Sequence, residues 1–453
     1  MREPIANSRA VIIGAGVVGC AIFRRLAMAG LEPIMLEAAS DILDGASKGN
    51  SALLHTGFDA PADSIELNCI QSGHREYLTI RDKLNLPLVE SGALVVAWDE
   101  EQLAKLPAIV AKAHRNGVSD VVQIDRDELR KCEPHLSERG LGAVHVPGEH
   151  IIDPWSAPLA YAHQGLAHGG KILRRCGVTG GAFDGVHWTL QTTLGEISAG
   201  VVINAAGNHG DLVEAINQPP AFAITPRKGQ FVVFDKPASK LLHAIILPVP
   251  TERTKGVVVC RTAFGNLLVG PTAEDQQDRS RADVDRATLD LLIAKGVEMI
   301  PELADQPVNA IYAGLRPATQ FKDYQIAVNR ERRWITAAGI RSTGLTAALG
   351  IAQMIGRSFA ETFGDVREAE PIWTPVPNLA EERPRQYMTE AGGDIVCHCE
   401  LVTRGEIAAA LEGPLPAGDL GGLKRRTRCM MGRCQGFYCS AQVLAMAEGR
   451  LQP

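Results

Sequence analysis

Residues 9–37 read RAVIIGAGVVGCAIFRRLAMAGLEPIMLE and contain the strongest structural signal in the chain. A short apolar run at Ala10–Ile13 predicts a strand, and it is followed by a glycine turn and by helical periodicity over Val17–Met28. A second apolar run, Pro33–Leu36, predicts another strand that ends at Glu37. The stretch therefore predicts a βαβ unit.

The turn GAGVVG places Gly14, Gly16 and Gly19 where a dinucleotide-binding unit needs glycine. Gly14 allows the tight turn, Gly16 lets the backbone approach a pyrophosphate, and Gly19 lets helix and strand pack closely. The N-terminus of the helix then holds the phosphates. Glu37 is suited to accept hydrogen bonds from the ribose hydroxyls. A carboxylate there disfavours the 2′-phosphate of NADP.

Composition is typical of a globular protein of two to four domains, with 453 residues, 45% of them hydrophobic and 22% charged. A net charge of −6 without a long basic run argues against a nucleic-acid partner. The apolar stretches are short or interrupted, which argues against a membrane span. The first residues have no basic region followed by an apolar one, so we expect a cytoplasmic protein.

Other segments extend the nucleotide-type domain and add a second one. Asp153–His168 predicts a helix, and Lys171–Leu173 and Val201–Ile203 predict strands. Gly92–Trp98 and Gln230–Phe234 suit an antiparallel sheet. The prediction is an α/β fold, a nucleotide-binding domain interrupted by insertions that form a sheet-rich domain.

We expect four parts along the chain. Prolines at 371, 375, 377 and 384 predict a polar linker that neither packs nor continues a helix. The expected ranges are 9–82, 150–217 and 308–368 for the nucleotide domain, 83–149 and 218–307 for the substrate domain, 369–392 for the linker and 393–450 for a C-terminal domain.

Five motifs resemble those of one superfamily. They are ASKGNSALLHTG (46–57), NAAGNHGD (204–211), PRKGQFVVFD (226–235), GNLLVGPTAED (265–275) and AAGIRSTGLTAALGIAQMIG (337–356). With the glycine turn, they resemble the glutathione-reductase-like FAD proteins of the D-amino acid oxidase superfamily. The resemblance covers about residues 9–365. It is strongest to the FAD subunits of anaerobic glycerol-3-phosphate dehydrogenases and to L-2-hydroxyglutarate oxidases.

The resemblance implies FAD as the cofactor. A helix that begins near Thr343 would direct its positive end at the pyrimidine edge of the flavin, where negative charge develops on reduction. Beyond the glycine turn and Glu37, the cofactor contacts that the motifs imply are Ser47, Asn50, Ser51, Ala206, Gly207, Gly339, Ile340, Gly344, Leu345 and Thr346. The sequence gives no reason to expect covalent attachment of FAD.

Two residues are the candidates for catalysis. His55 lies in LLHTG, where the resemblance implies proximity to the flavin, and it is interpreted either as the base or as a flavin contact. Arg316 lies in AGLRPAT, where relatives hold the anionic end of the substrate. A guanidinium can clamp a carboxylate or phosphate by two bonds. Weaker candidates for the same pocket are Lys48, Lys228 and Arg261.

Five of the ten cysteines lie in the tail, which favours metal binding over disulfides. The pattern of Cys397, Cys399, Cys434 and Cys439 resembles the bacterioferritin-associated-ferredoxin-like [2Fe-2S] domain, which implies these four thiolates as ligands. Cys429 is interpreted as an extra cysteine, although its spacing from Cys434 leaves it a possible ligand. A structural zinc site is the alternative.

Taken together, the residues and the resemblance predict an FAD-dependent dehydrogenase of a small anionic polyol phosphate. Hydride would pass to the flavin, and electrons would leave through the cluster to a partner subunit, flavoprotein or quinone pathway. The alternatives are oxidation of a 2-hydroxy acid or secondary amino acid, or a non-catalytic redox sensor or assembly protein. We expect an oligomer or multi-subunit complex, with any membrane association made through a partner.

Overall fold

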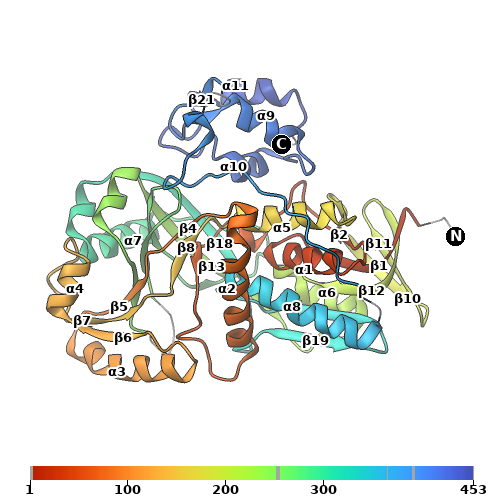
Figure 1. Ribbon diagram of the computed structural model, residues 1–453, viewed down its shortest axis with the longest axis horizontal. Coiled ribbons are helices and arrows are strands. Elements are labelled where there is room, and N and C mark those ends of the chain that lie inside the picture. The colour runs from red at the N-terminus through yellow and green to blue at the C-terminus, as the bar shows by residue number, and fades with distance from the viewer. Residues whose placement is uncertain (1–3, 251–255, 365, 390–392, 452–453) are drawn as a thin grey trace.

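The computed structural model describes residues 4–250, 256–364, 366–389 and 393–451. Two β-sheet domains lie side by side, and a small C-terminal domain sits above them (Figure 1). This is the predicted mixed α/β fold with a helical tail domain. Within the described ranges, every helix is too short or too polar to cross a membrane.

The first sheet is built around the predicted βαβ unit. β1 (Ala6–Ile13) pairs in parallel with β2 (Ile34–Leu36) and with β12 (Gly195–Asn204). β12 also pairs in parallel with β20 (Trp334–Ala338), and β2 with β9 (Lys171–Leu173). The carboxyl ends of β1, β12 and β20 therefore meet at one edge, where such sheets bind nucleotides. The antiparallel strands at the margins are β10 (Val178–Phe183), β11 (Trp188–Thr192) and β19 (Gln325–Asn329).

Helices pack closely on this sheet because glycine stands at their contacts. A Cβ on Gly73 would lie 2.0 Å from the carbonyl oxygen of Thr346, so two helix backbones meet there without a side chain between them. This contact fixes the first turn of α8, which faces the nucleotide edge. The helices are α1 (Val17–Met28), α2 (Ile65–Leu84), α5 (Ser156–Ala167), α6 (Gly210–Asn217) and α8 (Gly344–Phe363).

The second sheet has nine strands and is mainly antiparallel, with one parallel pair between β5 and β14. Its apolar faces form two clusters of buried side chains, one on each side. The strands are β5 (Ala93–Ala97), β6 (Val122–Asp125), β7 (Gly142–Val146), β13 (Ile224–Phe234), β14 (Ile245–Pro248), β15 (Val258–Arg261), β16 (Leu267–Gly270), β17 (Glu274–Asp275) and β18 (Val308–Thr319). Its helices are α3 (Glu100–Arg115), α4 (Arg126–Cys132) and α7 (Arg286–Met299).

The sheet boundary differs from the predicted boundary at residue 308. β18 falls in the range predicted for the nucleotide domain, but it pairs with β13 from Val308 to Thr319 and so belongs to the nine-stranded sheet. The strand joins this sheet through backbone pairing with β13, which cannot be read from its side chains. The boundary between the sheets lies after residue 319.

The linker also packs more closely than its prolines predict. Leu379 and Ala380 are each 1% exposed. The Val376 N–H donates to the carbonyl of Leu84 at 3.1 Å, and Asn85 donates back to Val376. In its described part the segment contains only a short 3-10 turn. Its backbone is instead hydrogen-bonded to residues at the end of α2.

The C-terminal domain has its own small apolar core. A two-stranded ladder of β21 (Ile395–Cys397) and β22 (Val402–Thr403) is followed by short helices. These are α9 (Arg404–Glu412), α10 (Leu420–Thr427) and α11 (Ser440–Ala447). In Figure 1, α10 is the helix of this domain that faces the rest of the molecule.

Candidate functional site

The glycine turn leaves a cradle that side chains would fill. Gly14 has φ +104°, and a Cβ there would lie 2.5 Å from the carbonyl oxygen of Ala205, at the end of β12. A Cβ on Gly19 would lie 1.9 Å from the carbonyl oxygen of Gly14. Glycine is therefore required at both positions for β1, β12 and α1 to meet. A helix N-terminus that follows such a glycine turn is the arrangement that binds a pyrophosphate in dinucleotide-binding folds.

Glu37 is held by backbone N–H groups at the end of β2. Its Oε2 accepts from Ala15 N at 2.8 Å, and its Oε1 accepts from Ala39 N at 2.8 Å. Burial raises the pKa of Glu37, while the N–H donors of Ala39 and Ala15 oppose that rise. A carboxylate offers about four lone-pair sites. The N–H of Ala38 also acts on this carboxylate, so part of its accepting capacity remains for ribose hydroxyls, which fits the adenosine half of a dinucleotide.

The loop predicted to lie against the flavin is fixed by its own polar side chains. Ser47 Oγ accepts from Val17 N at 2.9 Å, at the N-terminus of α1. Asn50 Oδ1 accepts from Ala52 N at 2.8 Å and holds Ala52 in a left-handed conformation with φ +61°. Ser51 follows Asn50 and is half-buried in the same loop.

The same loop contacts the strand that carries Arg316. A Cβ on Gly314 would lie 2.2 Å from the carbonyl oxygen of Gly49. Tyr312 donates its hydroxyl proton to the carbonyl oxygen of Asn50 at 2.7 Å. Arg316 follows both of these residues on β18. The nucleotide loop and the second sheet are therefore locked together beside this arginine.

His55 lies against a carboxylate that sequence reasoning missed. β3 (Leu53–Leu54) pairs antiparallel with β8 (His150–Ile152), so the residue after β3 faces the residue before β8. Those residues are His55 and Glu149, and His55 Nδ1 lies 2.8 Å from Glu149 Oε2. β4 (Leu88–Val89) completes this small sheet. Only the pairing of strands joins two residues so distant in sequence.

Glu149 is fully buried and hydrogen-bonded on both oxygens. Its Oε1 accepts from Thr56 N at 2.6 Å and from Thr56 Oγ1 at 2.9 Å. Its side chain is 0% exposed, whereas that of His55 is 19% exposed. An acceptor-only carboxylate at Nδ1 favours the tautomer with its proton on Nδ1. The lone pair of the neutral ring then lies on Nε2, where a proton can be accepted.

The closing helix is positioned by a chain of hydroxyl groups. Tyr324 and Thr343 hydroxyls lie 2.6 Å apart, and Thr343 donates to Glu66 at 2.7 Å. Thr346 accepts from His55 N at 2.9 Å and donates to Leu53 O at 3.2 Å. Thr346 is 1% exposed, so it orients the strand before His55 rather than facing an open site.

The remaining predicted cofactor contacts cluster at the ends of β12 and β20. Ala206 and Gly207 follow β12, and Gly207 has φ +54°. Gly339 has φ +66° and follows β20 directly. Ile340, Gly344 and Leu345 are half-buried around the first turn of α8. The N–H groups of that turn lack partners within the helix, which makes it suited to an anionic edge.

Arg316 is anchored through one side of its guanidinium. Its Nε donates to Arg227 O at 3.3 Å, and its Nη2 donates to Lys228 O at 3.2 Å and Thr272 O at 2.6 Å. Burial, and then neighbouring positive charges, lower the pKa of Arg316 to about 10. Among the described residues, none of its hydrogen bonds uses Nη1. The sequence predicted a guanidinium that binds an anion by two bonds. In the structure Nε and Nη2 donate to backbone carbonyls, so Nη1 is the nitrogen left for a ligand.

Arg341 is a second basic residue of the site that sequence reasoning missed. Its positive charge is among those that lower the pKa of Arg316, after burial and Arg227. Within the described ranges, neither Arg316 nor Arg341 has a carboxylate partner in an ion pair. Arg341 is half-buried in GIRSTG, between Gly339 and α8. Asp275, which pairs with Arg227, opposes part of this positive charge.

The weaker basic candidates are all engaged elsewhere. Lys48 pairs with Asp44 at 3.1 Å on the surface, and its side chain is 43% exposed. Lys228 pairs with Glu274 at 3.1 Å, and Arg261 pairs with Glu382 at 3.3 Å. The structure therefore brings none of the three into an uncompensated position.

The tail cysteines act on one another's pKa, most directly in two pairs. Cys434 acts on the pKa of Cys399 and Cys397 on that of Cys439, and Cys397 also acts on Cys399. Among the described residues, no three His, Cys, Asp or Glu side chains stand where one metal ion could join them. A tetrahedral zinc site needs four donors around one ion. Two pairs suit two irons, with one pair on each.

The loop around Cys434 favours the charged thiolate form of this cysteine. The pKa of Cys434 is lowered, first by the N–H of Tyr438 and further by those of Gly436 and Phe437. A Cβ on Gly432 would lie 2.3 Å from Cys399 Cβ, so glycine lets these two segments approach. N–H donors to sulfur are a general feature of iron–sulfur sites.

Cys429 differs from the four paired cysteines in its side-chain partner. Burial raises its pKa to about 11, and the group that most opposes this rise is the side chain of Thr427 rather than another thiol. We expect Cys429→Ser to keep the cluster, whereas Cys434→Ser should lose it, because only the second removes a member of a pair. Iron and zinc analysis after anaerobic purification checks this: wild type should hold about two irons per chain. One zinc per chain without iron, or a cluster lost only in Cys429→Ser, would contradict the pairing.

A buried ion pair joins the C-terminal domain to the nucleotide loop. Asp41 is 0% exposed and contacts Arg426 of α10 through both oxygens, at 2.6 and 2.8 Å. Its Oδ2 also accepts from Gly418 N at 3.1 Å. Arg425 donates to the carbonyl of Ile42 at 3.1 Å. The loop that begins at Glu37 therefore also holds the C-terminal domain in place.

Aromatic contacts continue this interface towards the flavin loop. Trp155 donates from Nε1 to Lys48 O at 3.3 Å and stacks on Phe264 with ring centroids 5.4 Å apart. The guanidinium carbon of Arg428 lies 4.0 Å from the centroid of the Phe264 ring. Arg428 directly precedes Cys429. The cysteine domain is therefore packed against the loop that the sequence predicts to contact flavin.

Comparisons with known proteins identify the family of the chain. The family model "FAD dependent oxidoreductase" matches residues 9–357, and "BFD-like [2Fe-2S] binding domain" matches residues 395–448. Glycerol 3-phosphate dehydrogenase of Caloramator mitchellensis is 28% identical, over 97% of this chain and 94% of that protein. One subunit of the anaerobic glycerol-3-phosphate dehydrogenase of Escherichia coli is 26% identical, over 98% and 88%. Dithionite-reduced L-alpha-glycerophosphate oxidase from Mycoplasma pneumoniae, solved with FAD bound, has a similar fold, with a TM-score of 0.76, 24% identity and coverage of 83% and 100%.

Proposed function

The chain belongs to the FAD dependent oxidoreductase family, and from this premise we propose that it oxidises glycerol 3-phosphate or a closely similar polyol phosphate. It is an oxidoreductase that carries FAD and a C-terminal [2Fe-2S] domain. The observation that carries the choice of substrate is the neighbouring positive charge of Arg316 and Arg341, neither of which forms an ion pair among the described residues, although Asp275 acts on Arg316 from its pair with Arg227. Two positive charges suit a phosphate dianion better than a single carboxylate.

Each of the chain's own residues has a role in this proposal. Arg316, through Nη1, and Arg341 bind the phosphate and fix the position of the carbon that is oxidised. His55 accepts the hydroxyl proton at Nε2, and Glu149 holds the ring in the required tautomer. Bound FAD supplies the two-electron acceptor for the hydride, and the cluster supplies a one-electron exit.

A substrate panel tests the proposal. Anaerobic addition of glycerol 3-phosphate should bleach the flavin absorbance, and glycerol should not, because it lacks the phosphate. L-2-hydroxyglutarate and proline represent the 2-hydroxy acid and secondary amino acid alternatives. Bleaching by only one of these would replace the proposed substrate, and bleaching by none would favour a redox sensor.

Arg316→Lys should weaken substrate binding about tenfold or more and slow flavin reduction, while FAD stays bound. Lysine keeps one charge but cannot donate to three carbonyls and a phosphate at once. Rapid-mixing measurement of flavin reduction against substrate concentration checks both effects. The matched control is Arg281→Lys, an exposed arginine that pairs with Asp283. Equal kinetics in the two variants would remove Arg316 from the site.

The setting of the reaction is also part of the proposal. None of the ten cysteines, all of which the structure describes, forms a disulfide, which suits a reducing compartment such as the cytoplasm. The Escherichia coli relative is, by its name, one component of an enzyme with several subunits. We therefore propose that this chain too works in a complex, in which a partner subunit, flavoprotein or quinone pathway takes the electrons.

A further inference from the structure

The two ends of the proposed substrate are bound by different parts of the fold. The phosphate faces Arg316, which lies on β18 of the second sheet. The hydroxyl proton goes to His55, which directly follows β3 in the small sheet of β3, β8 and β4. The span between the phosphate and the oxidised carbon therefore depends on how β18 is joined to the segment that leads to His55.

A contact between two backbones joins these parts. A Cβ on Gly314 would lie 2.2 Å from the carbonyl oxygen of Gly49, and a Cβ on Gly49 would lie 3.0 Å from the Cα of Gly314. Beside this contact, the Tyr312 hydroxyl donates to the carbonyl oxygen of Asn50 at 2.7 Å. Because glycine stands on both sides, no change of rotamer can alter the separation of the two backbones.

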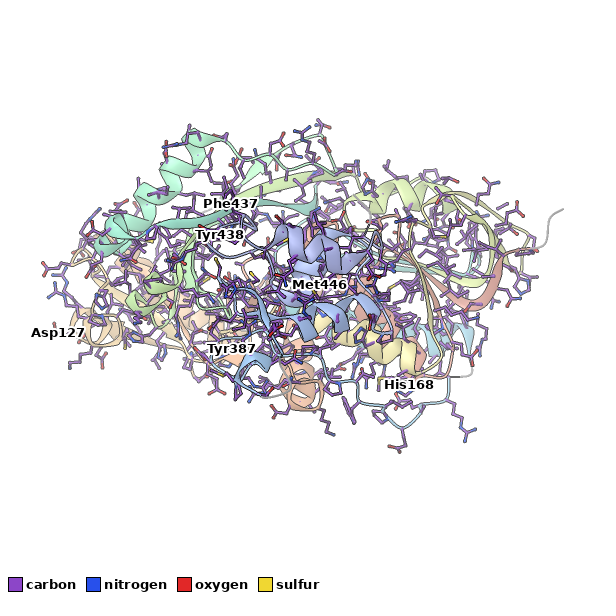
Figure 2. All side chains as sticks on the ribbon, turned by 90° about the horizontal axis from the view of Figure 1, so that it is seen from above. Asp127, His168, Tyr387, Phe437, Tyr438 and Met446 are labelled. Carbon is purple, nitrogen blue, oxygen red and sulfur yellow. The ribbon has the colours of Figure 1, made fainter. Side chains whose placement is uncertain are left out.

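The β18 side of the contact is held in place. The Tyr312 ring stacks on Phe231 of β13, with centroids 4.6 Å apart and 15° between the ring planes, and β18 pairs with β13 along its length. Figure 2 shows the C-terminal domain lying over the middle of the molecule, and Gln435 of that domain donates to the carbonyl oxygen of Asn309 on β18 at 3.1 Å. Arg316 therefore has little freedom to move relative to Tyr312.

The segment that leads to His55 is held in place as well. Asn50 Oδ1 accepts from Ala52 N at 2.8 Å, and Ala52 O accepts from Ile152 N at 2.9 Å. β3 then pairs with β8 as far as Leu54, directly before His55. A close-packed interior has low compressibility, so a displacement at Asn50 would be passed on to His55.

We propose that Tyr312 is a specificity-determining residue, because its bond to Asn50 keeps the phosphate site at one distance from the base. Tyr312 is a positioning residue, which acts through Arg316 on one side and His55 on the other. The inference rests on the proposed function and names its substrate class more narrowly. The class is phosphate monoesters in which a single methylene stands between the ester oxygen and the carbinol carbon. A longer ester would misplace the carbinol, and misplacement by about 1 Å costs about 10²-fold in rate.

The test compares two phosphates on the FAD-loaded protein. Glycerol 3-phosphate has one methylene between the ester oxygen and the carbinol carbon, and 3,4-dihydroxybutyl phosphate has one more. Rapid mixing gives the limiting rate of flavin reduction and the apparent affinity for each, and wild type should react about 10²-fold faster with the shorter ester. Tyr312→Phe keeps the ring but loses the hydroxyl, and it should lower this ratio about tenfold, as the loss of one hydrogen bond allows. The loss should fall on the limiting rate with glycerol 3-phosphate rather than on its affinity.

Tyr77→Phe is the matched control. Tyr77 is also buried and donates its hydroxyl to the carbonyl oxygen of Pro87 at 2.9 Å, on the far side of α2 from no part of the proposed substrate contacts. It should lower the melting temperature without changing the ratio. Inorganic phosphate, measured by titration calorimetry, should bind both variants as it binds wild type, because Arg316 keeps its own carbonyl anchors.

The outcomes separate this inference from the proposed function. An unchanged ratio in Tyr312→Phe, or the same change in Tyr77→Phe, would overturn the inference, and so would equal rates with the two phosphates in wild type. In each of these cases glycerol 3-phosphate still reduces the flavin, so the proposed function stands. If neither phosphate reduces the flavin, the proposed function fails and the inference fails with it.

Discussion

Glu149→Gln should slow flavin reduction by substrate about 10³-fold while leaving FAD and iron content unchanged. The amide oxygen of glutamine can replace Oε1, which accepts two bonds from Thr56. Its NH₂ group would then face His55 Nδ1, which must accept rather than donate. The proton moves to Nε2, and the ring can no longer accept the substrate's proton there. Rapid-mixing kinetics of flavin reduction measure the loss.

Cofactor content and substrate affinity separate this effect from mere loss of structure. The slow variant should retain wild-type FAD content, iron content and substrate affinity, which a destabilised fold would not do. His55→Gln should be as slow, because it has no ring to accept the proton. Thr56→Val is the matched control: it removes one hydroxyl donor to Glu149 but leaves the bond to His55. Wild-type rates in Glu149→Gln would exclude His55 as a base positioned by this carboxylate.

Local sequence signals were sufficient to predict the nucleotide-binding edge of the first sheet. The predicted helix Val17–Met28 has the bounds of α1, and the glycines of the turn stand where a Cβ would clash. The predicted strands at Lys171–Leu173 and Val201–Ile203 belong to the same sheet as β1, the second of them as its direct parallel neighbour. These features depend on residues close in sequence, where backbone conformation is decided by glycine and by apolar periodicity.

Features made by pairing of distant segments could not be predicted in the same way. Glu149 reaches His55 only because β3 and β8 pair in one register. Thr346 looks like a flavin contact in its motif, yet its hydroxyl is used to hold the strand before His55. β18 joins the second sheet by backbone hydrogen bonds that a sequence of this composition does not reveal.

The docking of the C-terminal domain is the clearest example of a contact that the sequence alone could not predict. Asp41 lies shortly after the nucleotide carboxylate Glu37, and in sequence it is one acidic residue among many. Burial against Arg426 is what gives it importance, because charges removed from water must be paired. The pair joins residues 385 positions apart. Sequence reasoning has no local signal for such a contact.

Asp41→Ala should release the cysteine domain from the flavin domain without removing either cofactor. It leaves Arg426, with a side chain only 6% exposed, without its carboxylate. Breaking one side of a buried pair costs about 3–5 kcal/mol, which lowers the docked fraction by about 10²–10³-fold relative to the undocked one. Substrate should still bleach the flavin at the wild-type rate, while reduction of the cluster, followed by freeze-quench electron paramagnetic resonance, should become slow.

Two further variants decide whether the ion pair itself is responsible. Asp41→Ala/Arg426→Met removes both charges of the pair and should restore part of the transfer rate, because Arg426 is then no longer a buried charge without a carboxylate. Recovery should be incomplete, since Arg174 and Arg425 still lose the charge of Asp41. Asp283→Ala should change little, since Asp283 is 70% exposed and pairs with Arg281 at the surface. Transfer as fast in Asp41→Ala as in wild type would mean that the aromatic contacts of Trp155, Phe264 and Arg428 hold the domain without the ion pair. Slow transfer in the single variant and recovery in the double variant would instead assign the docking to Asp41 and Arg426, and with it the path by which electrons reach the cluster.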